Sequence, residues 1–107
     1  MALPAPARAI TCRMPERPAR LPAGVEPYRT IGPFDAATLP PGLRKTHNLK
    51  DGTWGTVTLE LGSIGFVWED EAGGREELAA PAEVVVPPQV PHHVEGDAFR
   101  LSITFYR

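Results

Sequence analysis

The clearest alternation of apolar and polar positions lies in the middle of the chain, between His47 and Asp70. Over Gly55–Leu61, valine and leucine alternate with threonine and glutamate, and over Ile64–Trp68 the apolar side chains again occupy every second position. A period of two residues predicts strands with one buried face. The glycine of Gly62-Ser63 suits a tight turn between them. The pattern therefore predicts an antiparallel hairpin, with His47 just before it.

The rest of the chain predicts further short elements of the same kind. One helical turn is predicted over Phe34–Leu39, before a proline-rich stop. A polar turn is predicted over Glu69–Gly74, and its carboxylates are expected to be solvated. Short strands are predicted at Val25–Ile31, Leu43–His47, Arg75–Leu78, Glu83–Val86 and Phe99–Tyr106, with Val90–Val94 and a Gly96-Asp97 turn between the last two. About eight short strands at regular spacing favour an all-β sandwich or barrel.

Composition divides the chain into two parts. Thirteen of the 107 residues are proline, about twice the usual share, and proline breaks helices and central strands. Prolines, alanines and arginines gather in residues 1–24, for which we predict a flexible arm or an arm lying against a neighbouring subunit. Residues 25–107 are then predicted to form a single β-barrel domain. Cys12 lies in the arm and is expected to be a free surface thiol rather than a nucleophile.

Charge and hydropathy argue against nucleic acid and membrane as partners. The net charge is −2 and the lysines and arginines are dispersed, so we expect no binding to nucleic acid. No apolar run approaches the roughly 20 residues that a membrane-spanning helix needs. A secretory signal with its apolar core is also not evident. These features predict a cytoplasmic protein without a membrane partner.

Three histidines, His47, His92 and His93, are the main candidates for chemistry. Positions far apart in the sequence can meet in an antiparallel barrel if their strands pair. Imidazole is a ligand for several transition metals, and a catalytic metal site usually has about three protein ligands and an open position.

The flanking residues resemble a known family. The stretch from Val84 to His92, a strand ending in a proline-rich turn before a histidine, resembles the second cupin motif. The patterns HN-x-K-x-GTWG and P-x-x-x-PH-x-VE are similar to the small cupin family typified by YeaR, a domain that also forms the N-terminal part of some TehB tellurite-resistance proteins. The resemblance covers about residues 25–107. It implies a single cupin barrel (double-stranded β-helix, or jelly-roll) and a link to tellurite or stress response.

The first cupin motif is incomplete here, because it ordinarily supplies two histidines as H-x-H and then a glutamate. Here His47-Asn48-Leu49 stands in its place. We therefore predict His47 and His92 as metal ligands, against the alternative of two hydrogen-bonded histidines in a metal-free pocket. His93 and Glu95 are further candidate ligands. His93 is expected to face solvent, since neighbours on a strand point to opposite faces, and Glu95 is expected at the rim.

Two other residues are candidates for ligand contact. Trp54 is expected to wall the pocket or to be a packed aromatic at the start of a strand. Arg44 is expected to attract an anionic ligand to the barrel mouth or simply to be solvated.

Three functional hypotheses follow. The favoured one is a module that binds a divalent metal (Zn, Fe, Ni or Mn) or a small molecule in the barrel mouth. The second is a metal-dependent enzyme of the cupin type, a dioxygenase or isomerase. The third is a metal-free interaction scaffold. A homodimer is expected under all three.

Overall fold

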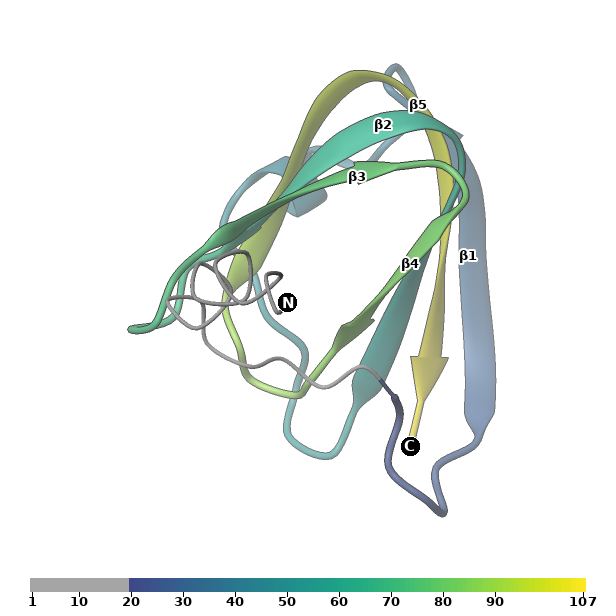
Figure 1. Cartoon of the computed structure of the whole chain (residues 1–107). Helices are drawn as coiled ribbons and strands as arrows, with labels where there is room; N and C mark the ends of the chain where they lie inside the picture. The colour runs from purple at the N-terminus through teal and green to yellow at the C-terminus, as the bar shows by residue number, and fades with distance from the viewer. Residues whose placement is uncertain (1–19) are drawn as a thin grey trace, which may run out of the picture.

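The computed structural model describes residues 20–107, which form one antiparallel sheet that bends around an apolar interior (Figure 1). The sheet has five strands in the order β1-β5-β2-β3, and β4 also pairs with β2. The elements are β1 (Pro27–Asp35), the short 3-10 helix η1 (Pro41–Arg44), β2 (Trp54–Trp68), β3 (Arg75–Ala79), β4 (Ala82–Val86) and β5 (His92–Tyr106).

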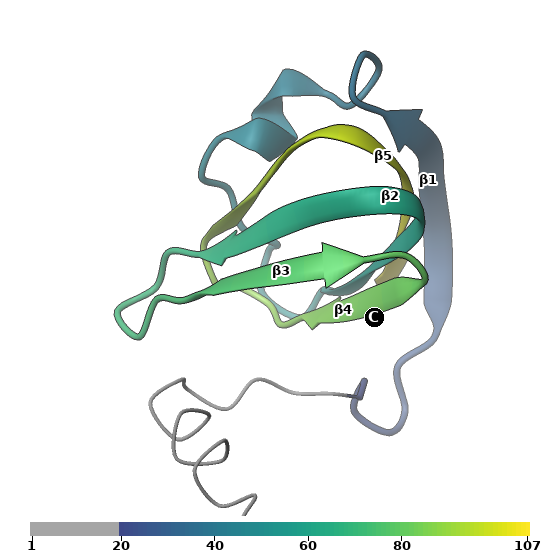
Figure 2. The ribbon, with the colours of Figure 1, turned by 45° about the horizontal axis from the view of Figure 1, so that its top comes forward.

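The two longest strands, β2 and β5, pair along their whole length, from Trp54 opposite Tyr106 to Trp68 opposite His92. The views of Figures 1 and 2 show them bending together over the interior. On the other edge of β2, β4 pairs with its first half and β3 with its second half. β1 pairs with the free edge of β5. Strand β2 therefore organises the sheet, and its ends set the position of His92.

The hairpin predicted at Gly62-Ser63 is wrong, because Gly62 lies within one continuous strand. Its φ is +78°, and the register with β5 shifts between Leu59 and Leu61 and again between Ser63 and Gly65. Within β2, the apolar core residues are odd-numbered up to Leu59 and even-numbered from Ile64 to Trp68. Such a change of phase marks a β-bulge, which bends a strand without ending it.

The same correction applies to the opposite strand, where Gly96-Asp97 was predicted to turn the chain. Gly96 (φ +150°) lies inside β5, and the core positions change from His92 and Val94 to Phe99 and Leu101. The actual hairpin turn is the predicted polar turn after Trp68, which leads into β3. Because predicted pairs of short strands merge into β2 and into β5, the described part of the chain has five strands rather than about eight.

The segment before β2 also differs from the prediction. β1 continues to Asp35, whose carboxylate accepts hydrogen bonds from the backbone N–H groups of Ala37 and Thr38. The predicted strand Leu43–His47 is instead the end of η1 followed by a single β-bridge between His47 and His92. The strands predicted at Arg75–Leu78 and Glu83–Val86 are confirmed within β3 and β4.

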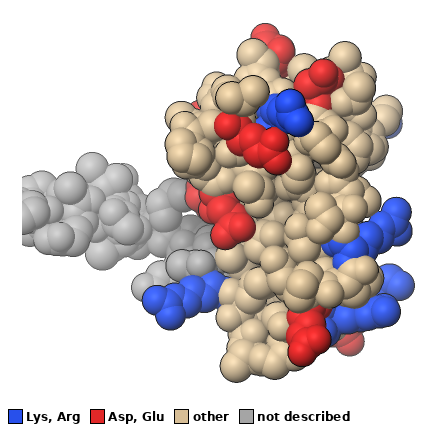
Figure 3. All heavy atoms as spheres, turned by 90° about the vertical axis from the view of Figure 1, so that its right-hand side faces the viewer, with Lys and Arg blue, Asp and Glu red and all other residues tan. Residues whose placement is uncertain are grey.

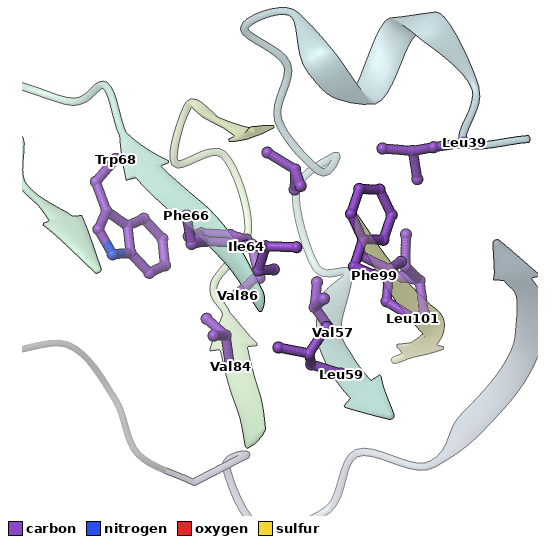
Figure 4. Close-up of a cluster of buried hydrophobic side chains, with 12 residues drawn as sticks. Leu39, Val57, Leu59, Ile64, Phe66, Trp68, Val84, Val86, Phe99 and Leu101 are labelled. Carbon is purple, nitrogen blue, oxygen red and sulfur yellow. The ribbon is translucent and has the colours of Figure 1, made fainter. Parts of the chain in front are cut away.

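The apolar core lies inside the bent sheet. Figure 4 shows side chains from β2, β4 and β5 converging, with Leu39 from the connecting segment lying beside Phe99. Phe66, Leu59 and Leu101 are the largest fully buried side chains. The all-β class is confirmed, and the described strands form an antiparallel sheet that curves like a barrel around an apolar interior. The predicted arm, residues 1–24, lies mostly outside the described residues, as does Cys12.

The surface carries charges of both signs in small separate groups. On the face shown in Figure 3, uncharged side chains cover the middle, and acidic and basic side chains lie around it. Within residues 20–107, no helix has the length and apolarity to cross a membrane.

The bulge predicts different costs for two glycine substitutions. A Cβ at Gly62 would lie 2.1 Å from the backbone oxygen of Ala98, whereas a Cβ at Gly52 (φ +81°) meets nothing within 4 Å. Backbone strain alone should make Gly52→Ala cost about 1 kcal/mol. The added clash should make Gly62→Ala cost about 3 kcal/mol or more. Urea unfolding of the two variants measures this difference, and equal losses would contradict the role of the bulge.

Candidate functional site

A cavity of about 240 Å³ opens into the interior of the barrel. Protein interiors contain few voids larger than a water molecule, so a space of this size is a distinct feature of the fold. Its walls come from β2, β4, β5 and the segment between β1 and β2. The lining residues are Leu39, Leu43, His47, Leu49, Gly55, Val57, Phe66, Val86, His92, Val94, Leu101, Ile103 and Phe105. Within this lining, His47 and His92 supply the polar side chains.

The backbone brings these two histidines together. The N–H of His47 donates to the carbonyl of His92 (3.0 Å), and the N–H of His92 donates to the carbonyl of His47 (2.9 Å). Directly opposed residues of an antiparallel bridge place their side chains on the same face. The two imidazole centroids are 4.2 Å apart, with the rings inclined by 63°. The predicted meeting of His47 and His92 is therefore present in the structure.

Both imidazoles are held in the same tautomer by the same local contact. Nδ1 of His47 is 2.9 Å from the carbonyl oxygen of Lys45, and Nδ1 of His92 is 2.8 Å from that of Val90. Because a carbonyl oxygen can only accept, each Nδ1 carries the hydrogen, and in the neutral ring each Nε2 keeps its lone pair. Histidines that ligate metals are commonly oriented in this way, through a ring N–H that donates to a backbone carbonyl.

His92 is the more buried of the pair, with 4% of its surface exposed. Its ring stacks on Phe66 (centroids 5.2 Å apart, 16° between planes) and lies 6.1 Å from the Trp68 ring. Burial lowers the pKa of His92 to about 4, although the hydrogen bond to Val90 opposes this shift. The ring is therefore neutral at physiological pH, and its Nε2 is available as an acceptor or a metal ligand.

The structure places the other two predicted ligands elsewhere. His93 points to the opposite face of β5 from His92, and its two ring nitrogens contact the carboxylates of Glu69 and Glu95. Glu95 also pairs with Arg75. The hydrogen bond with Glu95, and after it the one with Glu69, raises the pKa of His93. The hydrogen bond with Arg75, and after it the one with His93, lowers the pKa of Glu95. His93 and Glu95 thus form an ion-pair network on the outer face and are not brought together with His47 and His92.

The two predicted ligand contacts, Arg44 and Trp54, do not line the cavity either. Arg44 donates to the carbonyls of Gly96 (2.9 Å) and Ala36 (3.1 Å), and its guanidinium lies 5.7 Å from the centroid of the Phe99 ring. It therefore connects η1 to β5. Trp54 is half-buried at the start of β2, opposite Tyr106.

Sequence reasoning missed the role of Glu69, which it placed in a solvated turn. Its carboxylate accepts a hydrogen bond of 2.6 Å from the Thr46 hydroxyl and a second one from His93 Nδ1. Both hydrogen bonds lower the pKa of Glu69, and the one with Thr46 has the larger effect. Thr46 precedes His47 and His93 follows His92, so this one carboxylate joins the two segments that carry the histidine pair. The sequence shows that Thr46 and His93 are neighbours of the two histidines, but it gives no signal that both contact Glu69.

A resident metal would find two protein ligands here. Within residues 20–107, no group of three or more histidine, cysteine, aspartate or glutamate side chains is arranged to hold a metal ion. The donor set of His47 and His92 nevertheless fits an ion that favours imidazole nitrogen, because each Nδ1 donates to a backbone carbonyl and this leaves Nε2 as the ligand atom of each ring. The remaining coordination positions would have to come from water or from a bound molecule.

Comparison with known proteins identifies the family. The family model described as the TehB-like domain matches residues 29–103. The chain belongs to the TehB-like domain family. No curated protein matches it.

Two solved structures are similar to this TehB-like domain. TehB from Haemophilus influenzae is 27% identical with a TM-score of 0.70, and the match covers 77% of this chain and 31% of that protein. The chain thus spans about a third of the length of TehB. A protein from E. coli (strain K12) is 18% identical with a TM-score of 0.73, and the match covers 82% of this chain and 95% of that protein. At 18% identity, the similarity to the E. coli protein shows the fold alone. The resemblance to the YeaR and TehB family is therefore confirmed.

The depressed pKa of His92 predicts a stability that depends on pH. The unfolded chain binds a proton near pH 6.5 and the folded chain only near pH 4. The contribution of neutral His92 is therefore complete above pH 6.5 and is lost as the pH falls toward 4. It amounts to about 3 kcal/mol, at 1.36 kcal/mol per unit. Relative to His92→Gln, metal-free wild type should lose this amount between pH 7 and 4 in urea unfolding.

His93→Gln is the matched control, and its effect should have the opposite sign. The pKa of His93 is raised, so its contribution is present below pH 6.5 and is lost as the pH rises through the folded value. If wild type and His92→Gln lose the same free energy of unfolding between pH 7 and 4, the burial of a neutral His92 would be contradicted.

The position of Glu69 predicts a larger effect than its exposure suggests. Glu69→Gln should lower the urea midpoint more than Glu71→Gln, because Glu71 is an exposed residue of the same turn. Combining Glu69→Ala with Thr46→Val should be less damaging than the sum of the single changes, since each change alone removes the hydrogen bond between these two side chains. Additive losses would show that Glu69 does not hold the segment of His47.

Proposed function

We propose that this TehB-like domain binds a small molecule in the barrel cavity through His47 and His92, either directly or through a divalent transition metal. One observation carries the proposal: two imidazoles in fixed tautomers are the polar side chains of an otherwise apolar cavity. Ligand sites generally combine apolar walls with a few well-placed polar groups.

A metal would be held by the Nε2 atoms of His47 and His92. Zinc, iron and nickel suit imidazole donors, while manganese favours oxygen ligands. A bound ion would supply Lewis acidity to a coordinated oxygen. The protein's own contribution is to fix both rings by their Nδ1–H groups, to keep His92 neutral by burial, and to limit water through the apolar wall.

A metal-dependent enzyme is the second candidate function. It is favoured by the small number of protein ligands, since two histidines leave several coordination positions for a reactant. Binding without turnover remains the first candidate, because the lining contains no carboxylate or hydroxyl side chain that could assist as acid or base. A connection with tellurite or stress response belongs to this proposal on the strength of family membership.

Metal content tests the metal form of the proposal. Elemental mass spectrometry of the untagged protein should find about one equivalent of zinc, iron or nickel. Both His47→Ala and His92→Ala should lose it, because two ligands cannot be reduced to one without a large loss of affinity. His93→Ala is the matched control and should keep it. Wild type without metal after reconstitution would contradict the metal-bound form and leave direct binding by the imidazoles.

A further inference from the structure

The composition of the cavity wall defines what it can hold. None of the 13 lining residues is lysine, arginine, aspartate or glutamate, and apart from the histidines every lining side chain is aliphatic or phenylalanine. An unpaired charge moved from water into such surroundings is strongly disfavoured, and a polar group without a partner is also costly. The wall therefore selects against ligands with charges or polar groups away from the histidines.

The polar groups of the cavity are concentrated at one place. His92 lies opposite Trp68 at the end of the β2–β5 pairing, and the bridge holds His47 beside it. The apolar lining extends back along both strands, through Val94 and Phe66 on one side of the bulge and through residues such as Val57 on the other. A bound molecule thus meets hydrogen-bonding groups at one end and hydrocarbon along the rest of its length.

The tautomer fixes the hydrogen-bond polarity of both rings in their neutral form. Because both Nδ1–H groups are used by the carbonyls of Lys45 and Val90, each neutral ring offers only a lone pair at Nε2. A lone pair accepts from a hydroxyl or another donor. It offers nothing to a carboxylate, which can only accept.

The size of the cavity limits the ligand to a small molecule. A cavity of roughly 150 Å³ is known to hold benzene, with six non-hydrogen atoms. By the same ratio, the 240 Å³ of this cavity suits about ten non-hydrogen atoms.

We infer that the ligand of this domain is a compact, uncharged, mainly hydrocarbon molecule with one hydroxyl-type donor at one end, such as a small alcohol or phenol. This inference rests on the proposed function and names the class of ligand for the same site. The hydroxyl donates its one hydrogen to Nε2 of His47 or of His92, and the hydrocarbon part fills the space between β2, β4 and β5.

Matched probes of two shapes test the inference. The first set is p-cresol, its carboxylate analogue p-toluate, and hydroquinone, which has a second hydroxyl in place of the methyl group. The second set is hexanol, hexanoate and hexanediol. NMR titration of the isoleucine, leucine and valine methyl groups in the purified protein gives affinity and position together. The singly hydroxylated probe of at least one set should bind about tenfold or more tightly than its charged and doubly polar analogues.

Two sets of variants locate the binding. At least one of the variants His47→Ala and His92→Ala should weaken binding of the favoured probe, whereas His93→Ala should not. Leu43→Phe adds bulk to a half-buried lining residue outside the sheet, and should also weaken binding. Leu61→Phe makes the same change at a residue that is 60% exposed and does not line the cavity, so it should leave binding unchanged.

The outcomes separate this inference from the proposed function. Charged or doubly polar probes that bind as tightly as the alcohol or phenol, with dependence on His47 and His92, would overturn the ligand class and leave the binding site standing. Absence of binding by every probe would also overturn the ligand class, and the metal measurement would then decide the function. Binding of neither metal nor probe, with both histidine variants behaving as wild type, would overturn the proposed function itself.

Discussion

The continuous pairing of β2 with β5 is the constraint on which the rest of the structure depends. Two strands of 15 residues stay hydrogen-bonded from end to end, so a bend in one must be matched by a bend in the other. Gly62 and Gly96, both at positive φ, lie in the matching part of the two strands. The shared bend turns one flat ribbon into a curved wall, and the two halves of that wall enclose the core and the cavity.

The cavity follows from this bend and from an uneven distribution of polar groups. Apolar side chains from both halves of β2 and β5 face inward, while the end of the pairing brings in His92 and the bridge adds His47. Each ring is oriented by a carbonyl two residues before it in the chain. Two acceptor nitrogens in an apolar space cost free energy when they have no hydrogen-bond partner. This cost is the physical reason to regard the cavity as a binding site.

The outer face of the same strand end has a different chemistry. His93, next to the buried His92, belongs to a network of Glu69, Glu95 and Arg75. Alternation along β5 thus separates a neutral imidazole inside from an ionic network outside. Through Thr46 and His93, Glu69 connects the two histidine-bearing segments, so the outer network and the inner pair are built on the same two segments.

The sequence by itself determined the β class, the strands at Arg75–Leu78 and Glu83–Val86 and the family, and the family resemblance predicted that His47 and His92 lie together. Alternation and motif residues are local signals that need no knowledge of distant contacts. Tertiary structure decided the rest. Gly62 at positive φ suits a turn or a bulge equally well, and only the partner strand β5, which runs past it, makes it a bulge. For the same reason the roles of His93, Glu95, Arg44 and Glu69 depend on which side chains the bent sheet brings to them.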